Sequence, residues 1–229
     1  MARGRSTHRA IAILSLCAFL AGLDPAAGLE PREEQFHYRW RLTSFLGRIA
    51  GLFFPSRGEG VLSYTVNGEG NLVSQLEITS DRSAEGEYWL YGAEIDPERG
   101  RTVAAWSSYR YKEKSKSKRS PVDEQGVVDV ASGILQIRQA PPEGPQEMRI
   151  WSDGKIYPVE VVPMGDEELR LGKRKLRTRR YVVRGADHPG QPAWKGRIEL
   201  WLQEGEEATP AAILIYRSGI GVLLELDVG

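Results

Sequence analysis

The sequence predicts a mainly β protein: a single-domain curled antiparallel sheet or barrel-like fold with one packed helix, preceded by a signal peptide. Three observations predict this fold. Segments in which apolar and polar residues alternate recur along the chain, and turn sequences such as Asn-Gly and Asp-Gly separate them. Only one segment repeats its apolar residues at the three-and-four spacing of a helix. About ten or eleven short strands at this spacing are typical of an antiparallel barrel or sandwich.

The first 28 residues have the organisation of an export signal. A basic start is followed by an apolar core, Ala10–Leu23, and by the small residues Ala26-Ala27-Gly28. We therefore expect residues 1–28 to be a signal peptide, Leu29 to be the first mature residue, and the protein to be periplasmic or otherwise exported. An uncleaved anchor is the alternative. The only cysteine, Cys17, lies in that apolar core, so we expect no disulfide in the mature domain, 29–229.

The charge balance argues against one class of partner. The chain holds 31 basic and 31 acidic side chains, and loss of residues 1–28, with three arginines and one aspartate, leaves a net charge of −2. Because nucleic-acid-binding proteins carry an excess of basic residues, no nucleic-acid partner is expected. Membrane contact and oligomeric state stay open, but the mature sequence has no segment long and apolar enough to predict a transmembrane helix.

The first part of the mature chain predicts a strand and a hairpin. Strict alternation over Phe36–Thr43 predicts a half-buried strand. Ser44–Pro55 is an apolar connection, expected to pack across an end of the sheet, with an exposed lipid-contacting tip as the alternative. Gly60–Val66 and Leu72–Ile78 flank Asn67-Gly68, which suits a tight type I′ turn.

A second hairpin and a run of lysines come next. Gly86–Ile95 is expected to pair with Thr102–Tyr111 across a turn that contains Pro97 and Gly100. If the second strand continues into the following KEKSKSKRS sequence, lysines at every second position project to one side. Such a row of lysines would face an anionic surface, or it would be a solvated strand end that deters edge-to-edge pairing.

The one helix is predicted near 128–138. Asp129 is expected at the N-cap, and Arg138 lies near the end where a cation meets the negative pole of the helix dipole. Gly133 is unfavourable inside a helix, and a close approach to the sheet would explain it. The apolar residues on one face are Val127, Val130, Ala131, Ile134 and Leu135. We expect the helix to plug or cover the curled sheet, with any ligand pocket between the two.

The remainder predicts further strands. Glu147–Trp151 and Lys155–Val162 flank Asp153-Gly154, another tight-turn sequence. Pro158 and Pro163 lack a ladder N–H, so an edge or a bulge is expected there. The last strands are expected within 169–183, 194–202, 210–216 and 221–228.

Several of these features together resemble an uncharacterised family of exported bacterial proteins, the domain of unknown function numbered thirty-one hundred and eight. The features are Phe36-x-Tyr38-x-Trp40, Ala50-Gly51, the helix ending in Ile137-Arg138, the hairpin at Asp153-Gly154-Lys155 with Tyr157-Pro158-Val159, Leu200-Trp201-Leu202 and Leu224-Glu225-Leu226. The resemblance covers nearly the whole mature chain. It implies an extracytoplasmic, barrel-like antiparallel fold in a Gram-negative-type envelope, and it assigns no catalytic residue.

The residues that carry common chemistries are largely missing from the sequence. The mature chain holds only His37 and His188, neither at a metal-ligand spacing, so neither a metal nor another cofactor is expected. No Gly-x-Ser-x-Gly nucleophile elbow occurs. A glycan hydrolase needs two facing carboxylates. The candidates by density are Glu85, Glu87, Glu94, Asp96 and Glu98, and a solvated hairpin is the simpler explanation of them.

The remaining signal is aromatic. Aromatic residues fall on both faces of the segment Tyr88–Tyr91, so both sets cannot lie inside a barrel. We therefore expect an open groove with cations at its mouth, formed by Trp89, Tyr91, Tyr109, Arg110, Tyr111, Lys112 and Lys114. The hypothesis is a non-enzymatic binding or accessory module for an amphipathic envelope lipid or glycan with an acidic group. The alternatives are the carboxylate-dependent glycan hydrolase and a structural partner of another envelope protein.

Overall fold

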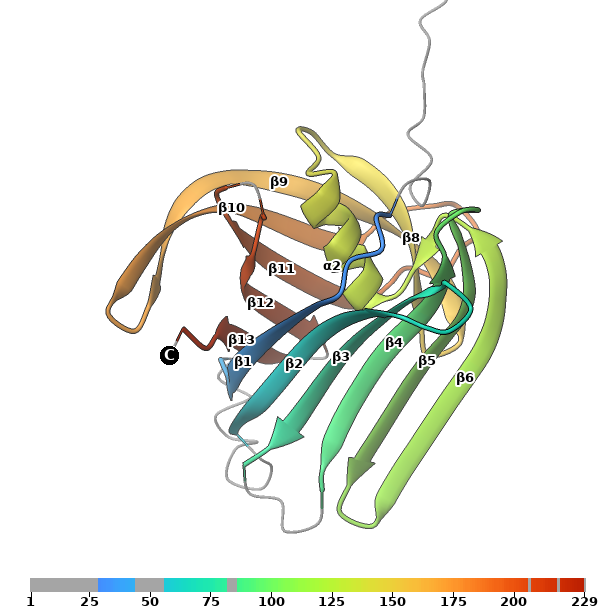
Figure 1. Ribbon diagram of the computed structural model, residues 1–229, viewed down its shortest axis with the longest axis horizontal. Coiled ribbons are helices and arrows are strands. Elements are labelled where there is room, and N and C mark those ends of the chain that lie inside the picture. The colour runs from blue at the N-terminus through green and yellow to red at the C-terminus, as the bar shows by residue number, and fades with distance from the viewer. Residues whose placement is uncertain (1–28, 44–55, 82–85, 206, 218, 229) are drawn as a thin grey trace, which may run out of the picture.

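The computed structural model describes residues 29–229 apart from 44–55, 82–85, 206, 218 and 229, and its described strands form one sheet curled around one helix (Figure 1). The strands are β1 Glu34–Leu42, β2 Arg57–Val66, β3 Leu72–Ser80, β4 Tyr88–Asp96, β5 Arg101–Tyr111, β6 Lys114–Gln125, β7 Val127–Val128, β8 Gln146–Ser152, β9 Lys155–Leu171, β10 Arg174–Gly185, β11 Gly196–Gln203, β12 Pro210–Arg217 and β13 Ile220–Leu226. The sheet order is β6-β5-β4-β3-β2-β1-β13-β12-β11-β10-β9-β8-β7. All neighbours are antiparallel except β7 and β8, and the predicted fold class is confirmed.

Side chains, rather than a shared backbone ladder, bring the two ends of the sheet together. In the described part of the chain β6 pairs only with β5, and β7 only with β8. The Thr102 hydroxyl on β5 donates to the Val127 carbonyl on β7. Beside it, Arg149 on β8 forms an ion pair of 3.0 Å with Glu124 on β6. The sheet is therefore barrel-like and nearly closed.

The first strand shows how the sequence pattern builds the core. Along β1 the residues Tyr38 and Trp40 are buried while His37, Arg39 and Arg41 are exposed, as the alternation predicts. Because burial removes apolar surface from water, each of these buried side chains stabilises the folded state by roughly 2 kcal/mol. The same period on the neighbouring strands lines the inside of the sheet with apolar groups.

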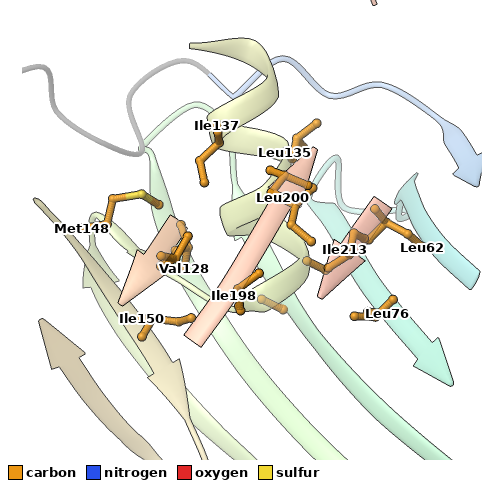
Figure 2. Close-up of a cluster of buried hydrophobic side chains, with 14 of the residues drawn as sticks. Leu62, Leu76, Val128, Leu135, Ile137, Met148, Ile150, Ile198, Leu200 and Ile213 are labelled. Carbon is orange, nitrogen blue, oxygen red and sulfur yellow. The ribbon is translucent and has the colours of Figure 1, made fainter. Parts of the chain in front are cut away.

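Helix α2, Val130–Gln139, lies inside the curled sheet (Figure 1). Its residues from 131 to 138 are all buried, so it is enclosed on nearly every side rather than along one stripe. Figure 2 shows Leu135 beside Leu200 of β11, and Ile137 on the side of the helix that faces Met148 of β8. The expectation of a helix packed within the sheet is confirmed.

The helix begins at the predicted N-cap. The Asp129 carboxylate accepts hydrogen bonds from the backbone N–H groups of Ala131 and Ser132, at 3.2 and 2.9 Å, and from the Ser74 hydroxyl of β3 at 3.1 Å. The Ser132 hydroxyl in turn accepts from the Asp129 N–H, which completes a capping box. Asp129 therefore fixes the helix start and joins it to the sheet.

One part of the helix prediction is wrong. Val127 and Val128 form β7 and precede the cap, so Val127 does not belong to the helical stripe. It is still buried, because the short strand lies in the core.

Gly133 has the expected role: a Cβ there would lie 3.3 Å from Cγ2 of Val128, so glycine allows the helix to approach β7 closely.

Arg138 holds the last turn of the helix. Its guanidinium forms an ion pair of 2.7 Å with Glu34 of β1 and donates to the carbonyls of Glu207 and Ala208. The ring of Phe36 lies 4.7 Å below it. Only 4% of the Arg138 side chain is exposed, and a buried cation is tolerated because it is paired and hydrogen-bonded in this way.

Two turns differ from the prediction. The connection of β2 to β3 spans 67–71, with the left-handed residue at Gly70 rather than at Asn67-Gly68, because the Asn67 side chain accepts from the N–H groups of Glu69 and Asn71. The sequence after Tyr111 does not continue as a strand: it turns at Lys112-Glu113 and returns as β6.

Other turns match the prediction from the sequence. At the predicted Asp153-Gly154 turn both residues have positive φ, as a type I′ turn requires. The bulge expected near Pro163 is present at Met164, where the β9–β10 register shifts. The apolar connection 44–55 lies outside the described residues. In the part of the chain that is described, no helix has the length and apolarity to cross a membrane.

Candidate functional site

The register of β4, β5 and β6 places five of the seven expected site residues on one face of the sheet. Trp89 pairs with Tyr109, and Tyr91 with Ser107. Tyr111 pairs with Lys114 across the β5–β6 turn. Paired residues in an antiparallel sheet point to the same side. Because Trp89 also pairs with Ile78, which is buried, this side is the inner face of the curled sheet.

Aromatic rings on this face contact one another. The Trp89 ring stacks on Tyr111, with centroids 6.5 Å apart and planes at 26°. Its other neighbour is Trp40 of β1, whose ring lies edge-on at 6.4 Å. Trp89, Tyr109 and Tyr111 are all half-buried, in contrast to the fully buried residues around the helix. A ring face that is both ordered and partly exposed is suited to contact with a flat apolar group or a sugar face.

Two of the expected residues do not join this face. Arg110 alternates with Tyr109 and Tyr111 and therefore lies on the outer face, where its guanidinium is 5.8 Å from the centroid of the Tyr88 ring. Lys112 lies in the turn, and its ammonium is 5.3 Å from the Tyr111 ring centroid. The prediction was wrong for Arg110, because a strand cannot turn three successive side chains to one side.

The lysines of β6 belong to the inner face. Lys114, Lys116 and Lys118 pair with Tyr111, Tyr109 and Ser107, so they project beside the rings. Lys118 donates to the Asp153 carbonyl at 3.3 Å. In the described ranges neither Lys114 nor Lys116 has an ion-pair partner within 4.0 Å, and both are exposed. Two uncompensated cations therefore flank the aromatic face.

The β8–β9 turn, which contains Asp153, lies against one end of the aromatic face. The Asp153 carboxylate accepts from Arg217 of β12 at 2.9 Å and from the Ser107 hydroxyl at 3.4 Å. Burial raises the pKa of the nearby Tyr91, and the negative charge of Asp153 raises it further. The turn thus links three strands, β5 through Ser107, β6 through Lys118 and β12 through Arg217.

Sequence reasoning missed Trp40, Asp153 and Arg217 as parts of this region. The alternation in Phe36–Thr43 already placed Trp40 on the core side of its strand. No local signal indicates that the Asp153 turn folds toward β5 and β12, because this contact depends on the curvature of the whole sheet.

On the side of strands β9 to β11, the space between helix and sheet is too small for a ligand, whereas a cavity of about 280 Å³ lies at the end of the helix beside Arg138 and Glu34. The cavity beside Val130, Ile134 and Ile198 measures about 20 Å³ and has an apolar lining. That volume is close to the space of one water molecule, and an apolar cavity offers water no partner. The pocket prediction is therefore wrong for this part of the interior.

Two of the five carboxylates proposed for glycan hydrolysis, Glu94 and Asp96, have other partners, and a third, Glu85, lies outside the described residues. Glu94 accepts from the side-chain amides of Asn67 and Asn71 and pairs with Arg119 at 3.2 Å. Burial would raise the pKa of Asp96, but hydrogen bonds from Arg99 and from the Glu98 N–H hold the pKa below its usual value. Both acids are therefore engaged in stabilising turns or strand pairs.

These features define a class: a barrel-like antiparallel β protein with an internal helix and a half-open aromatic inner face. A solved structure described as a beta-barrel-like protein of domain of unknown function DUF1849 from Brucella abortus is similar to it, with a TM-score of 0.53, 9% sequence identity, and coverage of 86% of this chain and 97% of that chain. At this identity the likeness shows the fold alone.

The sequence comparisons add no family. No protein-family model matches the chain. No curated protein matches it either. The resemblance to the domain of unknown function numbered thirty-one hundred and eight stays a prediction.

Proposed function

We propose that this protein is an exported, non-enzymatic binding module for an amphipathic envelope molecule that carries an acidic group next to an apolar or sugar face. The observation that carries the proposal is the register: Trp89, Tyr109 and Tyr111 share the inner face with Lys114 and Lys116. The rings supply apolar contact area and the two ammonium groups supply charge-assisted hydrogen bonds.

The half-exposure of the rings supports a binding role over a purely structural one. A core aromatic is buried completely, as Tyr38 and Tyr64 are at 1% and 0% exposure. The Trp89, Tyr109 and Tyr111 side chains instead keep part of their surface in water, beside lysines that have no ion-pair partner in the described residues. Covering these rings with a ligand would release the water on them, which is the main driving force for apolar association.

The proposal is tested by ligand titration with tryptophan fluorescence as the readout. One titrant is a short-chain phosphatidylglycerol below its micelle concentration, and the other is an oligosaccharide of uronic acids. Saturable binding of the first indicates a lipid, and saturable binding of the second indicates a glycan. Native mass spectrometry of protein taken from its own cell envelope gives an independent measure of any molecule that co-purifies.

Two variants and a matched control locate the site. Lys114→Gln with Lys116→Gln should weaken binding about tenfold or more, since each lost charge-assisted hydrogen bond costs roughly 1.5–3 kcal/mol. Trp89→Ala should weaken it comparably. Arg110→Gln removes a cation from the neighbouring strand β5, but from its outer face, so the affinity of this variant should stay within about twofold of the wild type. Equal effects of the lysine pair and Arg110→Gln, or no saturable binding of either titrant, would refute the proposal.

A further inference from the structure

The hairpin of β9 and β10 extends beyond the rest of the sheet. The two strands stay paired from the bulge at Met164 out to Leu171 and Arg174, and Figure 1 shows this hairpin reaching outward at the left of the view. We call residues 164–180 the arm. From Gly165 to Leu171 the chain advances about 20 Å at the usual rise of a strand.

The arm concentrates positive charge. It holds seven basic and three acidic residues, whereas the whole chain is balanced at 31 of each, so the rest of the chain has a net charge of −4. From Leu169 to Arg180 there is no acidic residue at all. The protein is therefore a slightly acidic body that carries a basic projection.

The three acids of the arm are all used within it or at its base. Asp166 pairs with Arg179 and Glu168 with Lys175, each at 2.8 Å. Glu167 lies 3.8 Å from Arg180 and accepts from the indole of Trp201. The hydrogen bonds from Arg179 and Lys175 also lower the pKa of Asp166 and of Glu168, so these acids stay ionised and paired.

Four cations remain at the distal end. All four are exposed, and in the described ranges none has an ion-pair partner within 4.0 Å: they are Arg170, Lys173, Arg174 and Arg177. Leu171 beside them is only 4% exposed. The tip thus has its apolar side chain covered and its charges in solvent, which is the arrangement of an electrostatic contact rather than of an apolar one.

We propose that the arm docks the protein on an anionic phospholipid surface. The four cations at the tip can lie against a flat surface, and the strand length of about 20 Å from Gly165 to Leu171 exceeds the screening length of about 8 Å at physiological salt, so repulsion from the acidic body is weakened there. A nucleic acid or another long polyanion would also approach the body, which repels it. The attraction of anionic lipids for basic side chains near the surface falls off over this same screening length.

The test is co-sedimentation of the purified full-length exported protein with vesicles of phosphatidylcholine, with and without a fraction of phosphatidylglycerol. Binding is expected only to the anionic vesicles, and high salt should abolish it. The arm variant combines Arg170→Gln, Lys173→Gln, Arg174→Gln and Arg177→Gln, and should lower the partition coefficient by about three orders of magnitude, since each basic residue near an anionic surface contributes about 1 kcal/mol. Its melting temperature should match the wild type, because these side chains are exposed.

The matched control removes the same charge away from the arm and from the ligand site, by Arg110→Gln, Lys112→Gln, Lys155→Gln and Lys195→Gln, which are all exposed. It should bind anionic vesicles as the wild type does. Equal losses in both variants would show an effect of net charge only, and a loss confined to the control would move the contact away from the arm; either result overturns the proposal. If soluble polyglutamate binds the wild type more tightly than anionic vesicles do, and the arm variant loses that binding, the phospholipid proposal is also overturned, in favour of an acidic protein partner. Since the arm variant leaves Lys114 and Lys116 intact, failure here does not affect the ligand site.

Discussion

Replacement of Asp129 tests how the helix is held inside the barrel. The Asp129→Ala change removes the acceptor for the N–H groups of Ala131 and Ser132 and for the hydroxyls of Ser74 and Ser132. At least three of these donors would be left in the core, at roughly 1 kcal/mol or more each. We therefore expect a loss of about 3 kcal/mol, a large part of the 5–15 kcal/mol that is usual for a domain.

The assay is thermal unfolding followed by circular dichroism at neutral pH. For a domain of this size 1 kcal/mol corresponds to about 2–4 °C, so Asp129→Ala should melt about 6–12 °C below the wild type. Asp129→Asn retains one acceptor oxygen and should lose less. A melting temperature of Asp129→Ala within about 2 °C of the wild type would refute the cap as a main support of the helix.

The same residue gives a pH dependence with a definite sign. Burial raises the pKa of Asp129 above its value in the unfolded chain, although the hydrogen bonds that it accepts oppose the rise. The folded state therefore holds the proton more tightly. The stabilisation is complete below the unfolded pKa of about 3.9 and is lost as the pH rises through the folded value. The difference in unfolding free energy between wild type and Asp129→Asn should fall as the pH increases from about 4; a flat or rising difference would contradict this reasoning.

Two further substitutions test the packing of the sheet and of the helix. In Gly92→Ala the new Cβ would lie 2.7 Å from the backbone oxygen of Ser74, so urea unfolding should show a loss of about 1–3 kcal/mol, whereas Gly144→Ala, with no neighbouring atom within 4 Å, should be neutral. In Leu135→Ala the lost core contacts should cost about 2–5 kcal/mol. The control is Met164→Ala, at a residue that is 55% exposed, which should lower the unfolding free energy by less than about 0.5 kcal/mol in the same urea titration. An equal loss in Leu135→Ala and Met164→Ala would show that the helix is not part of the core.

The sequence was informative wherever one side of an element meets the core. The alternation around Tyr38 and Trp40 predicts β1 because only one face of that strand is buried. The Asp153-Gly154 pair predicts its turn because both residues need positive φ. Asp129 predicts the helix start because a carboxylate can satisfy the free N–H groups of a first turn.

The sequence was uninformative at the edge of the sheet. Strand β6 begins with alternating lysines and serines, all exposed, and an edge strand of this kind has no apolar period to find. The turn before it contains no glycine: Lys112 adopts a φ of 52°, a conformation that few residues other than glycine, asparagine or aspartate take up. Arg110 was expected at the mouth of the aromatic groove, but it alternates with Tyr109 and Tyr111 along β5 and therefore lies on the outer face.

The placement of the helix explains why the candidate site lies where it does. The helix cap is tied to Ser74 of β3, whereas Trp89 pairs with Ile78 of that strand, four residues and about 13 Å farther along. The helix occupies the half of the interior around Ser74, and the cavity between it and strands β9 to β11 measures about 20 Å³. The other half is lined by rings and bordered by Lys114 and Lys116. The cap is held to Ser74 and the Trp89 ring lies farther along the sheet, so a loss of the cap should act on stability more than on the aromatic face of the folded protein.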